Sequence, residues 1–259
     1  MDLIKLIQPV YQTHSRRFVE LDVLRGFAII FMIFLHILWD LDYFGLIPMN
    51  TQIYQFQKIV PAMFFVLLGM CIVVSKNKKL NQPSFDEKRY NKRLFLRGLK
   101  IIGLGMIITI ITMIFIPDRP IIFGVLHCIG FSIILSIPFL KFKSYNILFA
   151  TLIILTGIIM GQYTIENPTV LHLAVGLHQS DIAQYTIDYF PLFPWFGGCL
   201  VGISLAHFLY KGNERRFKIP DLSKYKPVTM FSWLGQHSLA IYLFHQPVIT
   251  GTLFIYMTF

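Results

Sequence analysis

Long apolar runs separated by polar linkers dominate the chain and set its fold class. A helix needs roughly 20 apolar residues to cross the hydrocarbon core of a bilayer. Because lipid offers no partners for backbone polar groups, each run is expected to be helical. Runs of about this length occur at 21–40, 57–75, 94–116, 121–140, 145–161, 188–210 and 231–256. We therefore predict an all-α, polytopic transmembrane bundle of about seven helices.

The last run contains Pro247, which interrupts helical hydrogen bonding. The sequence leaves two alternatives open for this run, one kinked helix or two shorter helices. A chain of 259 residues is long enough for one bundle and too short for a bundle with a large soluble domain. We expect a single transmembrane domain over 1–259.

The basic residues alternate between linkers in a way that predicts orientation. The linkers on one side of the membrane contain only two basic residues, Lys58 and Arg119. Cytoplasmic linkers attract Lys and Arg, so we predict a multi-pass protein of the cell membrane with its N-terminus inside and its C-terminus outside. The remaining 21 of the 23 Lys and Arg lie in linkers 1–20, 76–93, 141–144 and 211–230, or at the adjoining helix ends as Arg25, Arg97 and Lys100.

Composition excludes several classes of protein. Charged residues make up 14% of the chain, against about 25% in a typical soluble domain. The net charge of +10 is explained by a cytoplasmic rim that faces anionic lipid headgroups, so we expect membrane lipids as partners and no nucleic acid. The three cysteines lie inside predicted spans without metal-ligand spacing, and we expect no metal site.

Ionisable residues inside the first run carry most of the functional information. Such residues are costly in a membrane and by default mark a functional site. At 100° per residue, Asp22, Arg25, His36 and Asp40 fall on one narrow stripe, which is expected to face the bundle interior. Asp40 follows His36 by four residues, so we expect it to hydrogen-bond the imidazole and fix its tautomer.

Later runs offer partners for this stripe. His127 lies in the fourth run, and His245 and Gln246 come directly before Pro247 in the last. Taken alone, each of these side chains fits a structural role, as a hydrogen-bonded group between neighbouring helices, better than a catalytic one.

Several motifs resemble those of known membrane enzymes. Ten residues separate Arg25 from His36, as in the arginine–histidine motif of the acyltransferase type 3 family. The rest of the chain resembles the bacterial and archaeal relatives of heparan-α-glucosaminide N-acetyltransferase. The similar segments are FFVLLG at 64–69, RGLKIIGLGMIIT at 97–109, FGVLHCIG at 123–130 and the closing LGQHSLAIYLFHQPV, and their order along the chain is the stronger argument.

The resemblance implies transfer of an acetyl or other acyl group from cytoplasmic acyl-CoA. The acceptor is expected to face outward and to be a sugar, glycan or glycolipid. His36 is expected to act as general base or as a nucleophile that forms an acyl-imidazole, and Asp40 to orient it. His127 would stabilise the thioester oxyanion or assist the leaving thiolate. The residues expected to bind the acyl-CoA donor are Arg25, Arg93, Arg97, Lys100, His245 and Gln246.

Two other hypotheses remain open from the sequence. A transporter or ion-conducting protein would use the stripe of the first run as a proton or ion path, and it would show flux without consuming acyl-CoA. A non-catalytic membrane subunit or lipid-binding scaffold would tolerate replacement of His36. Glycines such as Gly98 and Gly103 permit close helix contacts, within one chain or in an oligomer.

Overall fold

The computed structural model describes residues 18–48, 53, 56–80, 82–212, 214–220, 222 and 224–258. The basic residues that the sequence places before residue 18 lie outside this description. The described chain is mostly helical, which confirms the predicted all-α class. Its elements are α1 (Val19–Tyr43), α3 (Ile59–Leu80), α4 (Glu87–Phe115), α5 (Val125–Phe139), the 3-10 helix η2 (Leu140–Tyr145), α6 (Asn146–Met160), α7 (Val170–Val175), the 3-10 helix η3 (Ile182–Gln184), α8 (Leu192–Leu209), β1 (Tyr210–Lys211), β2 (Glu214–Arg215), α9 (Lys226–Gln236) and α10 (Ser238–Thr258).

Six helical segments of the described chain are long and apolar enough to cross a membrane. One of these segments, Val125–Met160, consists of α5 and α6 joined by η2. Lys143 in η2 has a φ of 50°, outside the helical range, so α5 and α6 are separate helices. Each of the seven predicted runs therefore contains a helix, and the protein is a multi-pass membrane protein.

Several predicted boundaries need correction. The last run is two helices, α9 and α10, and the break falls at His237 rather than at Pro247, which lies inside α10. α4 begins at Glu87 instead of residue 94, because the side chain of Asp86 accepts a hydrogen bond from the first-turn amide of Lys88, 2.9 Å away. The polar residues at the starts of α4 and α9 make these helices longer than the apolar runs that cross the hydrocarbon core.

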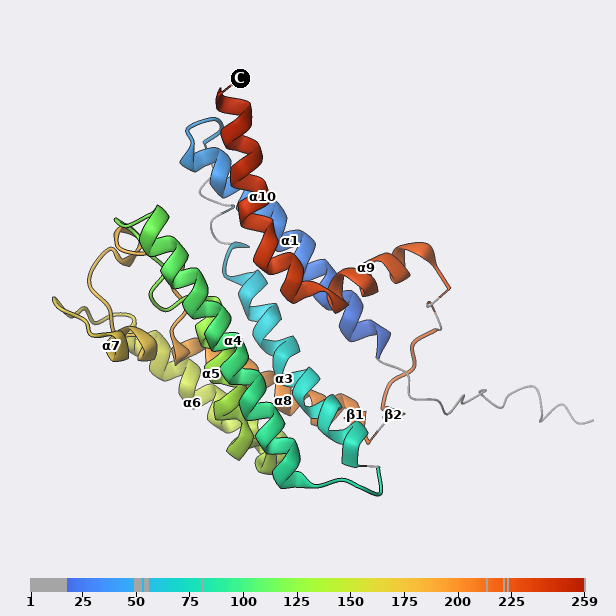
Figure 1. Ribbon diagram of the computed structural model, residues 1–259. Helices are drawn as coiled ribbons and strands as arrows, with labels where there is room; N and C mark the ends of the chain where they lie inside the picture. The colour runs from blue at the N-terminus through green and yellow to red at the C-terminus, as the bar shows by residue number, and fades with distance from the viewer. Residues whose placement is uncertain are drawn as a thin grey trace, which may run out of the picture.

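The helices form a main bundle with a smaller group beside it (Figure 1). α3 and α6 both pack on α8, and α5 packs on α4 and α8. Fully buried Phe65, Ile133 and Leu200 lie in the core of this bundle. α1 packs on α3 and carries α9 and α10 on its other side, so α10 runs along α1 at the edge of the molecule.

Glycines let the most tightly packed helices touch through their backbones. A Cβ atom added at Gly202 of α8 would collide with the carbonyl oxygen of Val66 in α3, and one at Gly69 would meet the carbonyl oxygen of Cys199. The pair α1–α9 is built the same way, since Gly26 contacts the backbone of Phe231. In a membrane, where lipid is as apolar as the side chains, such close approach supplies much of the attraction between helices.

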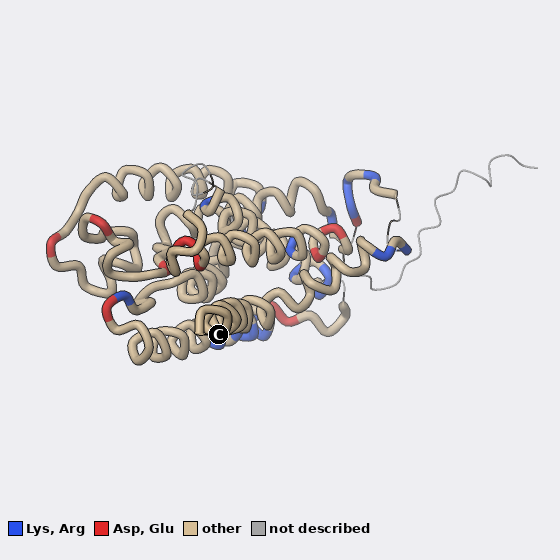
Figure 2. The backbone as a smooth tube through the Cα atoms, turned by 90° about the horizontal axis from the view of Figure 1, so that it is seen from above, with Lys and Arg blue, Asp and Glu red and all other residues tan. Residues whose placement is uncertain are grey.

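Charge separates along the long axis of the bundle (Figure 2). Lys and Arg gather at the end where α1 and α4 begin, and Asp and Glu predominate at the opposite end. The residues behind the predicted orientation therefore lie together in space, and we keep the prediction that the basic end faces the cytoplasm.

The close contact between α3 and α8 predicts that a residue larger than glycine at position 202 destabilises the protein. Gly202→Ala inserts a methyl group against the α3 backbone, and such overpacking typically costs about 1–3 kcal/mol. We expect a lower melting temperature for the purified variant in detergent, measured by intrinsic fluorescence. Gly103→Ala is the matched control, because a Cβ there meets nothing within 4 Å, and it should melt with the wild type. Equal melting of both variants would contradict the packing argument.

Candidate active site between α1 and α10

The polar stripe of α1 faces the C-terminal helices. Asp22 and Asp40 are 4% and 1% exposed, whereas Phe27 and Phe34 on the opposite side of α1 are about half exposed. The predicted stripe is therefore real, but its neighbours are α9 and α10 rather than the centre of the main bundle. The stripe is buried between helices, as expected, and the apolar side chains of Ile29, Met32 and Leu35 in α1 pack with Val60 of α3.

The outer half of the stripe meets α10 in a cluster of four polar residues, two buried and two half-buried. The side-chain amide of Gln246 donates to both carboxylate oxygens of Asp40, at 2.8 and 3.0 Å. The rings of His36 and His245 lie edge to face, with their centroids 4.7 Å apart. The structure thus brings together His36, Asp40, His245 and Gln246, all of which the sequence singled out, and we call them the histidine cluster.

The expected hydrogen bond between Asp40 and His36 does not form. Nδ1 of His36 lies 2.9 Å from the carbonyl oxygen of Met32, one turn back on α1. A carbonyl only accepts, so Nδ1 carries the proton and Nε2 holds a free lone pair in the neutral ring. His245 is fixed in the same way by the carbonyl of Tyr242, at 2.6 Å. The backbone carbonyl, rather than Asp40, therefore sets the tautomer of His36.

The histidine cluster keeps unused hydrogen-bonding capacity. Nε2 of His245 and Oε1 of Gln246 are buried, and neither has a hydrogen-bond partner among the described residues. Buried polar atoms are almost always paired, and exceptions call for a functional explanation. Both atoms are acceptors, so the cluster suits a ligand that donates hydrogen bonds, such as an amine or a hydroxyl group.

A second polar group lies at the inner end of the stripe. Arg25 forms an ion pair with Asp22, and the amide of Gln236 in α9 reaches Asp22 at 3.3 Å and Ser232 at 3.2 Å. Along α1, Arg25 lies roughly 16 Å from His36, as 11 residues of helix require. The two groups thus share one helix face and are separated by about half the thickness of a bilayer core.

The predicted donor-binding residues of α4 lie on the surface. Arg93, Arg97 and Lys100 are exposed, and their spacing puts them on one face of α4. Arg25 and Arg97 both lie within electrostatic range of the Cys71 thiol, so both guanidinium groups approach α3 at the inner end. Arg93 and Lys100 extend this basic surface along the exposed face of α4.

His127 lies apart from the histidine cluster. It belongs to the first turn of α5, and its ring stacks on Phe123 with centroids 5.7 Å apart and packs against Gly105 of α4. Both ring nitrogens are buried without a hydrogen-bond partner in the described part of the chain. The structure thus leaves His127 chemically available but does not bring it into contact with His36.

Asp188 supports this part of the molecule, and sequence reasoning gave it no role. It lies in the loop before α8, which begins at Leu192 instead of residue 188 because Pro191 keeps an extended backbone. Its carboxylate accepts a hydrogen bond of 3.0 Å from the amide of Val125, at the first residue of α5. Burial raises the pKa of Asp188 to about 6, and the bond from Val125 opposes the shift.

Comparison with known families adds a decisive observation to this geometry. Residues 17–247 match the family described as heparan-alpha-glucosaminide N-acetyltransferase, catalytic. The chain belongs to this family. The match extends from the start of α1 to Pro247 and includes the whole histidine cluster. Heparan-alpha-glucosaminide N-acetyltransferase catalytic domains are membrane acetyltransferases, which fits the multi-pass fold. No curated protein and no solved structure matches the chain.

The raised pKa of Asp188 predicts a pH-dependent stability. Between pH 3.8 and about 6 the folded chain binds a proton that the unfolded chain lacks. The stability from this proton is complete below pH 3.8 and is lost as the pH rises through about 6. Asp188→Asn keeps an oxygen for Val125 and removes the titration. Between about pH 4 and pH 7, the melting temperature of the wild type should therefore fall more than that of Asp188→Asn.

Exposed Asp181 of the same linker provides the control for this measurement. Asp181→Asn should follow the wild-type pH dependence. Parallel melting curves for the wild type and Asp188→Asn would contradict the assignment to Asp188.

Proposed function

We propose that this protein transfers an acetyl group from cytoplasmic acetyl-CoA to an amine or hydroxyl of an outward-facing glycan or glycolipid in the cell membrane. The observation that supports it most is the histidine cluster, in which His36 keeps a free Nε2 lone pair beside buried acceptors of α10. The family match supports acetyl transfer. We propose that the donor reaches the cluster from the basic end along the polar face of α1.

In the proposed reaction, Nε2 of His36 acts as general base on the acceptor. The acceptor oxygen or nitrogen attacks the thioester carbonyl as Nε2 takes its proton. The carbon–sulfur bond then breaks, and the departing thiolate of CoA takes the proton back from the His36 imidazolium. Gln246 and His245 accept hydrogen bonds from the acceptor or the pantetheine amides. Asp40 acts as a positioning residue, because its carboxylate holds the Gln246 amide.

The same nitrogen also supports a two-step route through an acetyl-imidazole on His36. The two routes differ in what happens before the acceptor arrives. An acetyl-enzyme releases CoA in a burst that matches the enzyme concentration, even without acceptor. Direct transfer releases CoA only when the acceptor is present.

His127 fits the role of oxyanion donor in this scheme. One of its ring nitrogens carries a proton in the neutral form, and neither has a protein partner in the described chain. Because His127 packs between α4 and α5 and His36 packs on α10, the thioester would have to lie between these two helix pairs. Arg25 and Arg97, with Arg93 and Lys100 on the outer face of α4, are proposed to hold the CoA phosphates at the basic end.

The catalytic assignment predicts a large effect at His36. His36→Ala should lower the rate of CoA release from acetyl-CoA, with D-glucosamine as acceptor, by about 100-fold to 10,000-fold. The rate is measured by thiol titration on protein in nanodiscs. His172→Ala changes a half-buried histidine of α7 that lies outside the histidine cluster, and it should keep the wild-type rate. Turnover of His36→Ala at the wild-type rate would exclude the assignment, and ion flux through wild-type liposomes without CoA release would favour a transporter.

The donor site predicts a separate change in binding. Arg97→Ala removes a phosphate-binding charge, so the KM for acetyl-CoA should rise by about tenfold while kcat changes little. Lys92→Ala is the matched control, since Lys92 is exposed on another face of α4. An unchanged KM for Arg97→Ala, or an equal rise in both variants, would remove Arg97 from the donor site.

A further inference from the structure

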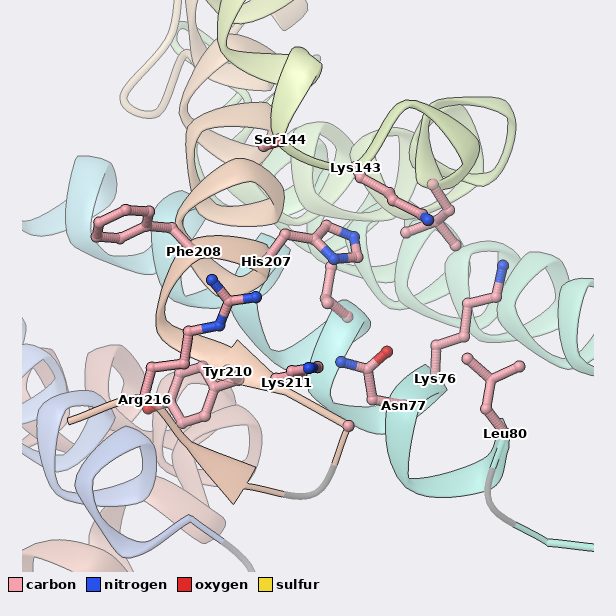
Figure 3. Close-up of a pocket in the computed structure, with 13 residues that line it drawn as sticks. Lys76, Asn77, Leu80, Lys143, Ser144, His207, Phe208, Tyr210, Lys211 and Arg216 are labelled. Atoms are coloured by element: carbon pink, nitrogen blue, oxygen red, sulfur yellow. The ribbon is translucent and has the colours of Figure 1, made fainter. Parts of the chain in front are cut away.

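A basic pocket lies at the inner end of the main bundle, away from the histidine cluster. Its volume is about 560 Å³, within the range of small-molecule sites. The walls come from the ends of α3 and α8, the turn η2 and the β1–β2 hairpin. Figure 3 shows the side chains of Arg216, His207 and Lys143 around one hollow, with Lys76 and Asn77 of α3 on another side of it.

The charges of this pocket have one sign. The described residues that line it include no Asp or Glu. They include four cations, Lys76, Lys143, Lys211 and Arg216. Glu87 of α4 pairs with Lys76 from outside, at 2.6 Å, and neutralises one of these cations. The ammonium groups of Lys76 and Lys143 both lie within electrostatic range of His207. Bringing like charges together around a hollow is unfavourable unless an anion balances them.

The backbone holds Lys143 in the pocket at an energetic cost. Its φ of 50° and ψ of −124° are values that glycine adopts easily and lysine rarely. Fully buried Asn146 donates to the carbonyls of Lys143, at 2.7 Å, and Phe139, at 2.9 Å, and Ser204 of α8 donates to the carbonyl of Ser144. These bonds fix the turn. Strain that persists under such constraint is typical of binding and catalytic sites.

The hairpin wall is also fixed in place. The amide of Arg216 donates to the carbonyl of Leu209, at 2.9 Å, which ties it to the end of α8. Next to it, Arg215 binds the carboxylate of Glu20 at the start of α1 through two nitrogens, at 2.7 and 2.8 Å. The four cations of the pocket thus come from three segments, α3, η2 and the β1–β2 hairpin, each held by its own contacts.

We propose that this pocket binds a phosphate ester at the inner membrane surface. Its cations can contact several phosphate oxygens at once, and Asn77 and Ser144 add neutral polar groups. Two sources have this chemistry, the 3′-phospho-ADP end of CoA and the headgroup of an anionic phospholipid. The first source rests on the proposed acetyl-CoA dependence and would place the CoA phosphates in this pocket instead of at Arg25 and the cations of α4. The second source does not depend on acetyl-CoA.

The test uses variants that separate binding from folding. Lys143→Gly removes the ammonium group and relieves the positive φ, so its melting temperature should equal or exceed that of the wild type. Arg216→Ala removes a second cation. Lys141→Ala is the matched control, because Lys141 is exposed in the same turn and does not line the pocket.

The probes are 3′-phospho-ADP and dioctanoyl phosphatidic acid, titrated calorimetrically into the purified full chain. We expect the wild type and Lys141→Ala to bind at least one probe equally, and Lys143→Gly/Arg216→Ala to bind it about tenfold or more weakly. If the double variant loses affinity for 3′-phospho-ADP, the ligand is the nucleotide end of CoA. If it loses affinity for phosphatidic acid, the ligand is a lipid headgroup. The proposal is overturned if the wild type binds neither probe or if the folded double variant binds like the wild type.

Acetyl transfer is measured on the same preparations, which keeps the two proposals apart. If the wild type transfers acetyl groups and the double variant keeps its probe affinity, the proposed phosphate site is wrong and the proposed acetyltransferase activity stands. If the wild type binds a probe through the pocket but transfers no acetyl group, the proposed acetyltransferase activity is wrong and the proposed phosphate site stands.

Discussion

Direct contact between helix backbones is the constraint on which the site depends. Gly26 of α1 and Gly235 of α9 each leave room for the main chain of the other helix, so α9 lies against α1 without side chains between them. That contact brings Gln236 to Asp22, and after the break at His237 it directs α10 along α1. The histidine cluster forms farther along the same pair of helices. A bulkier residue at either glycine would move both polar groups of α1 away from their partners.

Much of the fold could be predicted because length and apolarity decide whether a segment enters a membrane. The stripe on α1 could be predicted for a similar reason, since helical periodicity fixes which residues share a face. The partner of His36 could not. Asp40 has the right spacing, but the carbonyl of Met32 is also one turn away and takes the Nδ1 proton. The interruption expected at Pro247 was also misplaced. Pro247 lies inside α10, because a transmembrane helix tolerates proline where its neighbours supply hydrogen bonds.

Features assembled from distant segments escaped prediction. Counting Lys and Arg located a basic rim, but it did not reveal that Lys76, Lys143 and Arg216 converge on one hollow. Instead, the resemblance and the position at the inner end of the third run favoured Arg93, Arg97 and Lys100, which the structure leaves exposed along α4. Asp188 was missed because its partner, the amide of Val125, is 63 residues away in the chain. Local patterns describe one helix at a time, and these sites depend on how loops from several helices meet.

The pairing of α1 with α10 has a consequence for biosynthesis. Asp40 and Gln246 are 206 residues apart, so α1 enters the membrane long before its partner helix leaves the ribosome. Until then, the two aspartates and the arginine of its polar stripe face lipid, other early helices or the insertion machinery, at a cost of a few kcal/mol each. Delivery of α9 and α10 relieves that cost and completes the histidine cluster in one event. A chain that ends before α10 lacks His245 and Gln246, so the proposed centre would be complete only once both helices have been translated.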